Sequence, residues 1–171
     1  MRGEKTLREL YQIQHHVMMA HVHLTQYLHQ SKPQCLMGGM LAHALVYPAT
    51  CKPRDMLCAQ QLDEFLNQNL LRAYAGEGYS PEVMHVVARE GLDDIYLPDD
   101  LALMATVKID YLAFSYYASK ALDSDAIPPG TPVNNYMQFG DKKNEYLQAT
   151  EWNWQIDPVG FRMIITRYYN D

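Results

Sequence analysis

The sequence has no excess of basic residues, no even set of cysteines and no long apolar run. Lys and Arg number 14 against 20 Asp and Glu, a formal net charge of −6. No basic surface is therefore expected for nucleic acid. Three cysteines without a signal peptide or metal-ligand spacing favour reduced thiols. No apolar run approaches the roughly 18 residues that indicate a membrane span. We expect a soluble, cytoplasmic protein that binds neither nucleic acid nor membrane.

What remains is an ordinary globular composition. The 171 residues are 48% hydrophobic and 20% charged, which is enough apolar material for one compact core. Five helices are predicted from three- and four-residue apolar periods and from Pro, Ser and Asp at their starts. They cover residues 7–30, about 18 residues from Pro53, 81–91 after the cap Ser80, 98–107, and 159–169 after Asp157 and Pro158.

Two short apolar runs indicate strands. Residues 109–114 carry one charge, Asp110, and read as a strand buried on both faces in a parallel sheet. Residues 35–44 form the other run. Residues 123–150 are rich in Pro, Gly, Asn and Lys and predict a long surface loop. Because two strands leave unpaired edges and cannot close a barrel, the sequence indicates a piece of a larger α/β fold.

Histidines and paired aspartates are the first candidates for chemistry. Five of the seven histidines fall between His15 and His29, but none are four apart on a helix, so no metal site is predicted. The pairs Asp93-Asp94 and Asp99-Asp100 stand at loop or helix-start positions and predict caps rather than paired catalytic acids.

Aromatic residues provide the stronger candidates. Ser115, Tyr116 and Tyr117 follow the predicted strand, where α/β barrels place their active sites. Tyr117 is either a substrate-site residue or a buried tyrosine with a structural partner. Residues 152–158 form either an aromatic wall for a sugar ring or the packing that anchors the last helix.

Four phrases together resemble the family-one glycoside hydrolases, most closely the bacterial 6-phospho-β-glucosidase branch. They are Tyr11-Gln-Ile-Gln-His-His16, Gly39-Met-Leu-Ala42 leading to Tyr47-Pro48, Asp110-Tyr-Leu-Ala-Phe-Ser-Tyr-Tyr117 and Glu151-Trp-Asn-Trp-Gln-Ile-Asp-Pro-Val-Gly160. The resemblance implies a partial (β/α)8 TIM barrel, mostly helical by residue count. It runs from about strand five to the helix before strand seven, and residues 1–171 form a single incomplete barrel fragment.

The resemblance also implies a function and its site residues. Members of the family that this sequence resembles use two catalytic glutamates, in Asn-Glu-Pro and Glu-Asn-Gly motifs. This sequence contains neither motif. No catalytic residue is therefore expected within the chain. Tyr117 matches the tyrosine that hydrogen-bonds the nucleophile, Ser115 is the form similar to the phospho-sugar branch, and Tyr47 would lie on the aglycone side.

The resemblance thus implies a fragment of a retaining glycosidase that hydrolyses phosphorylated β-glucosides without a cofactor or metal. The isolated fragment is predicted to be inactive. The alternative is a non-catalytic half-barrel whose open strand edges drive it to form a homo-oligomer or to pair with a complementing chain.

Overall fold

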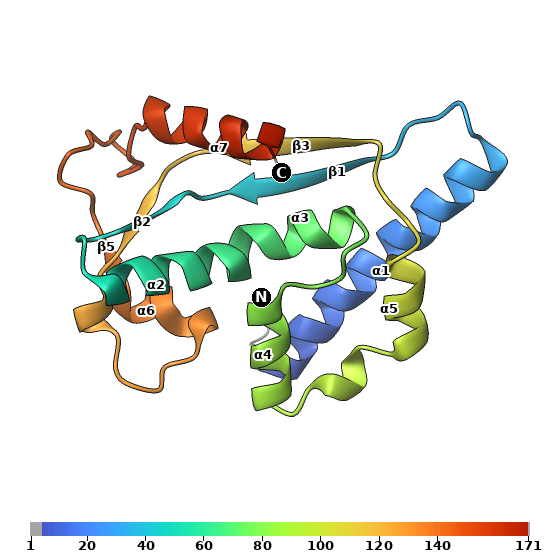
Figure 1. The fold of residues 1–171 in the computed structure, drawn as a ribbon, viewed down its shortest axis with the longest axis horizontal. Helices are drawn as coiled ribbons and strands as arrows, with labels where there is room; N and C mark the ends of the chain where they lie inside the picture. The colour runs from blue at the N-terminus through green and yellow to red at the C-terminus, as the bar shows by residue number, and fades with distance from the viewer. Residues whose placement is uncertain (1–4, 171) are drawn as a thin grey trace. The chain divides into compact units, whose positions relative to one another are not determined.

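A computed structural model describes residues 5–170, which form a helix-rich α/β arrangement without a closed barrel (Figure 1). Two compact units divide the chain. The first comprises the residues up to Met40 and Asn69–Ala113, and the second comprises Leu41–Gln68 and the residues from Phe114 onward. The helices are α1 Leu7–Ser31, α2 Pro53–Asp63, α3 Asn69–Tyr74, α4 Pro81–Arg89, α5 Pro98–Met104, α6 Tyr136–Gly140 and α7 Pro158–Asn170. The strands are β1 Gly38–His43, β2 Val46–Pro48, β3 Tyr111–Tyr116, β4 Lys120–Leu122 and β5 Asp141–Lys142.

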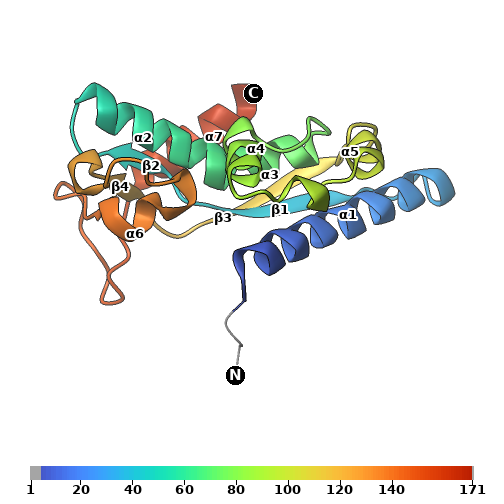
Figure 2. The same ribbon diagram turned by 90° about the horizontal axis from the view of Figure 1, so that it is seen from below.

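Helix α1 dominates the first unit and confirms the prediction for residues 7–30. It contains neither Gly nor Pro, and a capping box starts it: Thr6 accepts a hydrogen bond from the Glu9 backbone while the Glu9 carboxylate accepts one from the Thr6 backbone. One stripe of the helix is buried, and α1 packs against α5 (Figure 2). The buried stripe consists of Tyr11, His15, Met18, Met19, Val22 and Thr25.

The shorter helices of the first unit confirm one predicted cap and overturn two others. Ser80 caps α4, as predicted, by accepting a hydrogen bond from the backbone N–H of Val83. Leu97 occupies the N-cap of α5, so Asp100 lies inside the first turn and contacts His15 instead. Asp94 pairs with Arg8 at 2.7 Å. The predicted aspartate caps are therefore wrong, because α5 begins at Pro98, two residues too early for Asp99 to cap it, and Leu92 holds the cap position before Asp93.

The helix predicted from Pro53 is confirmed and runs further than expected. A π-helical segment, Glu64–Gln68, connects α2 directly to α3. Helix α7 also forms as predicted, with the Asp157 side chain accepting a hydrogen bond from the backbone N–H of Gly160 at 2.7 Å. Helix α5 ends at Met104, slightly before the expected residue 107.

Both predicted strands form, β1 and β3, and they pair as a two-stranded sheet. The strand predicted at 109–114 lies at Tyr111–Tyr116, so Ser115 and Tyr116 belong to it rather than follow it. The prediction that it is buried on both faces is wrong, because Tyr111 is 54% exposed and no residue of β3 is fully buried. Within residues 5–170, β3 has one strand partner, and burial on both faces would need neighbours on both sides.

A second sheet, of order β2–β4–β5, was not predicted. Strands β2 and β4 run parallel, with Val46 opposite Lys120 and Pro48 opposite Leu122, and β5 adds antiparallel. Figure 2 shows β2 and β4 beside α2 and α6. The predicted loop at 123–150 therefore contains a helix and a strand. Two- and three-residue strands are too short to show an alternating pattern in the sequence.

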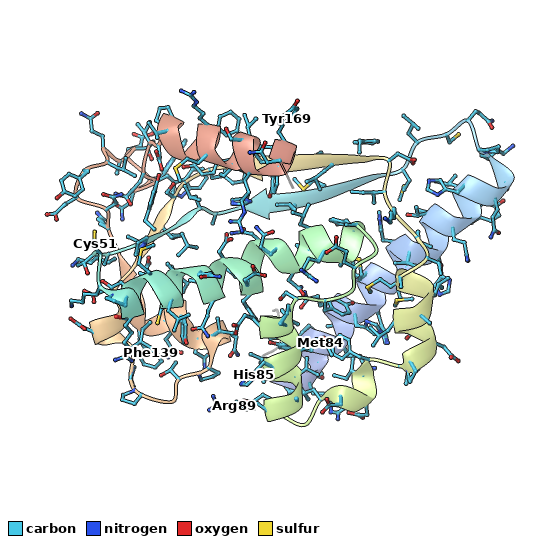
Figure 3. All side chains as sticks on the ribbon, in the orientation of Figure 1. Cys51, Met84, His85, Arg89, Phe139 and Tyr169 are labelled. Atoms are coloured by element: carbon cyan, nitrogen blue, oxygen red, sulfur yellow. The ribbon has the colours of Figure 1, made fainter. Side chains whose placement is uncertain are left out.

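The three cysteines are free, with Cys35 and Cys51 exposed and Cys58 buried. Figure 3 labels Cys51 on the loop that leads into α2. Among residues 5–170 no helix is long and apolar enough to cross a membrane.

Candidate functional site

A buried carboxylate organises the second unit where several of its segments meet. Asp157, at the start of α7, is only 5% exposed. Its Oδ2 accepts hydrogen bonds from the Tyr47 hydroxyl at 2.9 Å and from Ser119 Oγ at 2.6 Å. The Tyr116 hydroxyl lies 2.6 Å from Ser119 Oγ and donates to the Asp157 backbone carbonyl at 3.3 Å. One side chain thus ties together β2, the end of β3, the segment after it and α7.

The electrostatics of this network keep Asp157 ionised and Tyr47 neutral. Burial by itself would raise the pKa of the Asp157 carboxyl, but the hydrogen bonds from Ser119, Gly160 and Tyr47 outweigh burial and leave that pKa below its ordinary value. Burial and the adjacent Asp157 carboxylate raise the pKa of Tyr47. The Tyr47 phenol is therefore a hydrogen-bond donor and does not act as a base.

Tyr117 lies beside this network and faces solvent. Its side chain is 59% exposed, and its ring meets Trp154 edge-on at 5.5 Å between centroids. Ser115 is half-buried in β3. Neither hydroxyl has a hydrogen-bond partner among residues 5–170, so the predicted role of Tyr117 in orienting a nucleophile stays a prediction. The alternative of a buried tyrosine held by a structural partner does not match this exposure.

Tyr47 lies in β2, where its side chain reaches the buried Asp157. Its ring is half-buried and its hydroxyl is committed to Asp157. One side of the residue still lines a small cavity of about 120 Å³ with Lys142 and Tyr146. Whether that cavity faces an aglycone stays a prediction.

The aromatic segment 152–158 divides into two parts. Asp157 and Gln155 are buried and anchor the start of α7. Trp152 and Trp154 are 70% and 47% exposed, with ring centroids 6.0 Å apart. Polar residues therefore do the anchoring, and both indoles are left free to form an aromatic wall.

Lysines near these aromatic residues were missed by the sequence reading. Lys142 and Lys143 line both the 120 Å³ cavity and a second one of about 170 Å³ that also includes Trp154. Their sequence, Asp141-Lys-Lys, lies in the segment predicted as a loop. Only the pairing of β5 with β4 places them beside Tyr47 and Trp154.

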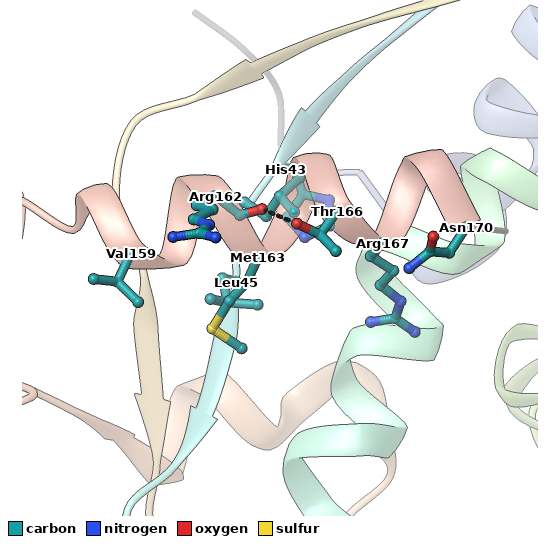
Figure 4. Close-up of a pocket in the computed structure, with 9 residues that line it drawn as sticks. His43, Leu45, Val159, Arg162, Met163, Thr166, Arg167 and Asn170 are labelled. Carbon is teal, nitrogen blue, oxygen red and sulfur yellow. Dashed lines mark hydrogen bonds between the residues drawn. The ribbon is translucent and has the colours of Figure 1, made fainter.

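A larger open groove of about 610 Å³ runs along α7 (Figure 4). Leu45, Val159 and Met163 form its apolar part, and Arg162 and Arg167 line it as well. Arg167 pairs with Asp63 at 2.6 Å. Within residues 5–170 no carboxylate lines this groove, so these residues offer no group there for acid–base attack on a glycosidic bond.

His15 takes a structural position. His15 is buried in the first unit, with Nδ1 2.9 Å from the Tyr79 hydroxyl and Nε2 3.2 Å from Asp100. Among residues 5–170 no group of three His, Cys, Asp or Glu side chains is arranged to hold a metal ion.

Comparisons with known proteins identify the family of this chain. The profile of glycosyl hydrolase family 1 matches residues 2–171. Over 167 residues the chain is 33% identical to a 6-phospho-β-glucosidase of Dickeya chrysanthemi, covering 94% of this chain and 34% of that protein. It is 30% identical over 168 residues to 6-phospho-β-glucosidase AscB of Escherichia coli, covering 98% and 35%.

Solved structures of other proteins share the fold. The AHE enzyme from Alicyclobacillus herbarius superposes with a TM-score of 0.77 at 25% identity, over 97% of this chain and 35% of that one. The β-glucosidase BglU from Micrococcus antarcticus gives 0.78 at 21% identity, over 92% and 36%. The chain spans about 35% of the length of these relatives. With nearly all of its residues matched by the family profile, the chain belongs to glycosyl hydrolase family 1.

Proposed function

We propose that this chain is an internal part of a cytoplasmic 6-phospho-β-glucosidase, a retaining glycosidase that hydrolyses phosphorylated β-glucosides. The observation that carries the proposal is the match over nearly the whole chain to relatives named as phospho-β-glucosidases, at 30% identity or more for several of them. Residues 1–171 then form a single incomplete barrel fragment, from about strand five to the helix before strand seven.

The strand ends provide the supporting geometry. In a (β/α)8 barrel the active site lies at the carboxyl ends of the strands. In this chain Tyr117 directly follows β3 and is exposed there, with Trp154 against its ring. A retaining glycosidase needs two carboxyl groups about 5–5.5 Å apart. Tyr117 would hydrogen-bond the nucleophilic carboxylate, and Ser115 would lie beside the phospho-sugar. Both carboxyl groups would come from segments outside the 171 residues.

The first test is activity of the isolated chain. We expect no hydrolysis of 4-nitrophenyl 6-phospho-β-D-glucoside, because a tyrosine that orients a nucleophile has no effect without the nucleophile. Turnover by the purified chain that is lost in Tyr117→Phe would mean that the catalytic groups lie within these residues and that this assignment is wrong.

The second test completes the barrel. The segment of E. coli AscB that aligns with this chain is replaced by residues 2–171, and the chimera is assayed on phosphorylated and unphosphorylated 4-nitrophenyl β-glucosides. We expect hydrolysis of the phosphorylated substrate alone. Tyr117→Phe should lower kcat about tenfold, as expected for one hydrogen bond to a charged group.

Tyr111→Phe is the matched control for this chimera, since Tyr111 is a similarly exposed tyrosine at the other end of β3. A folded chimera that hydrolyses the unphosphorylated substrate equally well would contradict the phospho-sugar assignment. Equal losses in Tyr117→Phe and Tyr111→Phe would contradict the role of Tyr117.

A second candidate function follows from the exposed apolar side chains on the strands. Met40 of β1 and Tyr111 of β3 are both more than half exposed, and an open strand with such residues favours pairing with another chain. A homo-oligomer or a complementing chain would cover them. Size-exclusion chromatography with light scattering decides this point, since a monomer that unfolds cooperatively would exclude self-association.

A further inference from the structure

Lys142 and Lys143 stand between two small cavities of the second unit. One of about 120 Å³ is lined by Tyr47 and Tyr146, and the other, of about 170 Å³, by Lys120, Asn153 and Trp154. The two lysines line both cavities, so a single ligand lying across them would contact every part of this surface. We call the two cavities together the lysine site.

Charge is unevenly balanced in the lysine site. Among residues 5–170, neither Lys120 nor Lys143 has an ion-pair partner, and Lys142 has a single contact of 3.4 Å with Asp123. Asp141 and Glu145 line one cavity each, but neither carboxylate is within ion-pair distance of a lysine. Lys120 and Lys143 are therefore two cationic side chains of the site without direct neutralisation, in a chain whose net charge is −6. A bound anion would relieve their mutual repulsion.

Aromatic rings surround the same lysines. Trp154 lines the larger cavity, and Tyr146, which is 88% exposed, lines the smaller one. Tyr117 lies against Trp154. Exposed aromatic rings beside ammonium groups suit a ligand that carries both a ring and a negative charge, because the ring faces bind apolar surface while the ammonium groups bind the anion.

The backbone around the site is held in place before any ligand binds. The buried Gln155 side chain donates to the Asn144 carbonyl at 2.6 Å and accepts from the Asn144 backbone N–H at 3.1 Å. These two bonds join the ends of the 144–155 segment. Asn153 lies in the left-handed region at φ 65°, an uncommon conformation for a residue other than glycine. Little of the binding free energy is therefore lost in ordering this segment.

We propose that the lysine site binds an anionic group, phosphate, sulfate or carboxylate, attached to an aromatic ring. Strand β2, which contains Tyr47, follows β1, and Tyr117 and then β4 follow β3, so the site lies beyond the carboxyl ends of β1 and β3. If the proposed function holds, this position is on the leaving-group side of the cleft. The lysine site then selects β-glucosides with an anionic aryl leaving group, while binding itself does not depend on catalysis.

The test uses the chain's own tryptophans. Trp152 and Trp154 are its only two, so fluorescence excited at about 295 nm reports directly on the edge of the site. Phenyl phosphate is titrated into the 171-residue chain, with inorganic phosphate and phenyl β-D-glucoside in parallel. We expect saturable quenching by phenyl phosphate, weaker binding of inorganic phosphate, and no saturable binding of the neutral glucoside.

Variants then assign the binding to these lysines. We expect Lys143→Gln to weaken phenyl phosphate binding about fivefold, the upper range for one partly exposed charge pair, and Lys142→Gln with Lys143→Gln to weaken it at least tenfold. The control carries the same charge change elsewhere, with Lys32→Gln and Lys108→Gln, both exposed residues of the first unit. Its affinity should stay within a factor of two.

Three outcomes would overturn the inference: no saturable quenching by phenyl phosphate, equal weakening in the control variant, or equal binding of the neutral glucoside. Each is a binding result on the chain alone. A failed phospho-glucosidase assay of the chimera leaves the lysine site standing, and a failed titration leaves the proposed function standing.

Discussion

The two compact units bury polar groups in different ways. In the first unit an imidazole joins helices, with His15 of α1 between the Tyr79 hydroxyl and Asp100 of α5. In the second unit carboxylates join loops and strand ends. Asp157 holds Tyr47 and Ser119, and Asp55 accepts hydrogen bonds from Thr50 and Ser124.

The difference separates a scaffold from a site. Helices already satisfy their own backbone groups, so the hydrogen bonds of the His15 imidazole need only add to the apolar packing of α1 against the segments beside it. Loops after strands have unpaired backbone and hydroxyl groups, and an ionised carboxylate can accept several of these hydrogen bonds at once. The second unit therefore holds its strand ends rigidly, next to Tyr117 and the lysine site.

The largest expected effect is the loss of Asp157. Asp157→Ala should lower the free energy of unfolding by about 3 kcal/mol, because the groups of Tyr47, Ser119 and Gly160 lose a buried charged acceptor. Urea denaturation followed by tryptophan fluorescence measures it, since both tryptophans belong to the second unit. Asp125→Ala, at an exposed ion pair with Lys52, is the control. Equal effects of the two changes would show that the Asp157 network is not what stabilises this unit.

A matched pair of substitutions compares the two units directly. Tyr47→Phe removes a bond to a carboxylate and should cost about 2 kcal/mol, whereas Tyr79→Phe removes a bond to an imidazole and should cost about 1 kcal/mol. Both changes delete one hydroxyl and leave the ring. Denaturation of both variants, by fluorescence and by far-UV circular dichroism, gives the two values. The reverse order would contradict the distinction drawn here between the units.

Acid should weaken the second unit through Asp55. Burial by itself raises the pKa of this carboxyl, but the hydrogen bonds from Ser124 and Thr50 outweigh burial and hold the pKa at about 2. Because the folded pKa lies below the unfolded value of about 3.9, the stabilisation is fully present above about pH 4 and is lost as the pH falls toward 2.

Thermal unfolding between pH 6 and pH 2 measures this loss of stability. Asp55→Asn should have a lower melting temperature at pH 6 and a shallower decline in acid. A decline as steep as that of the unchanged chain would assign the acid sensitivity to other carboxyls, Asp157 among them.

The smallest expected effect is in the first unit. Ser80→Ala removes the side chain that caps α4 and should cost about 1 kcal/mol. Thr106→Ala is the control, since the Thr106 hydroxyl bonds only to the Leu103 carbonyl near the end of α5. Circular dichroism suits this measurement because α1, α4 and α5 supply most of the first unit's helix. A loss no greater than that of Thr106→Ala would mean that α4 does not depend on its cap.

The elements that the sequence predicted correctly are those with a local pattern. The stripe from Leu7 to Ser31, the Pro53 and Pro158 starts and the Ser80 cap each depend on residues within one or two turns of helix, so they could be read in order along the chain. The sequence identified Tyr117 as a candidate by its place after an apolar strand and by the resemblance of its motif. The sequence did not predict the contact of Tyr117 with Trp154.

Elements that depend on distant partners could not be predicted. Strand β4 forms because Lys120–Leu122 lies beside Val46–Pro48, some 70 residues earlier, and β5 exists only as its neighbour. The lysine site depends on that pairing. The exposure of β3 was mispredicted for a similar reason, since burial of an apolar strand depends on the strands that flank it.

By itself, therefore, the sequence determined the five predicted helices, two strands and the family, because periodicity, caps and motifs depend on residues that are close together along the chain. The tertiary structure decided which of the polar residues meet. Asp157 gathers Tyr47 and Ser119 from segments 110 and 38 residues away, and Lys142 and Lys143 reach Trp154 and Tyr47 through a short sheet. A hydrogen bond depends on proximity in space, which chain order alone does not specify.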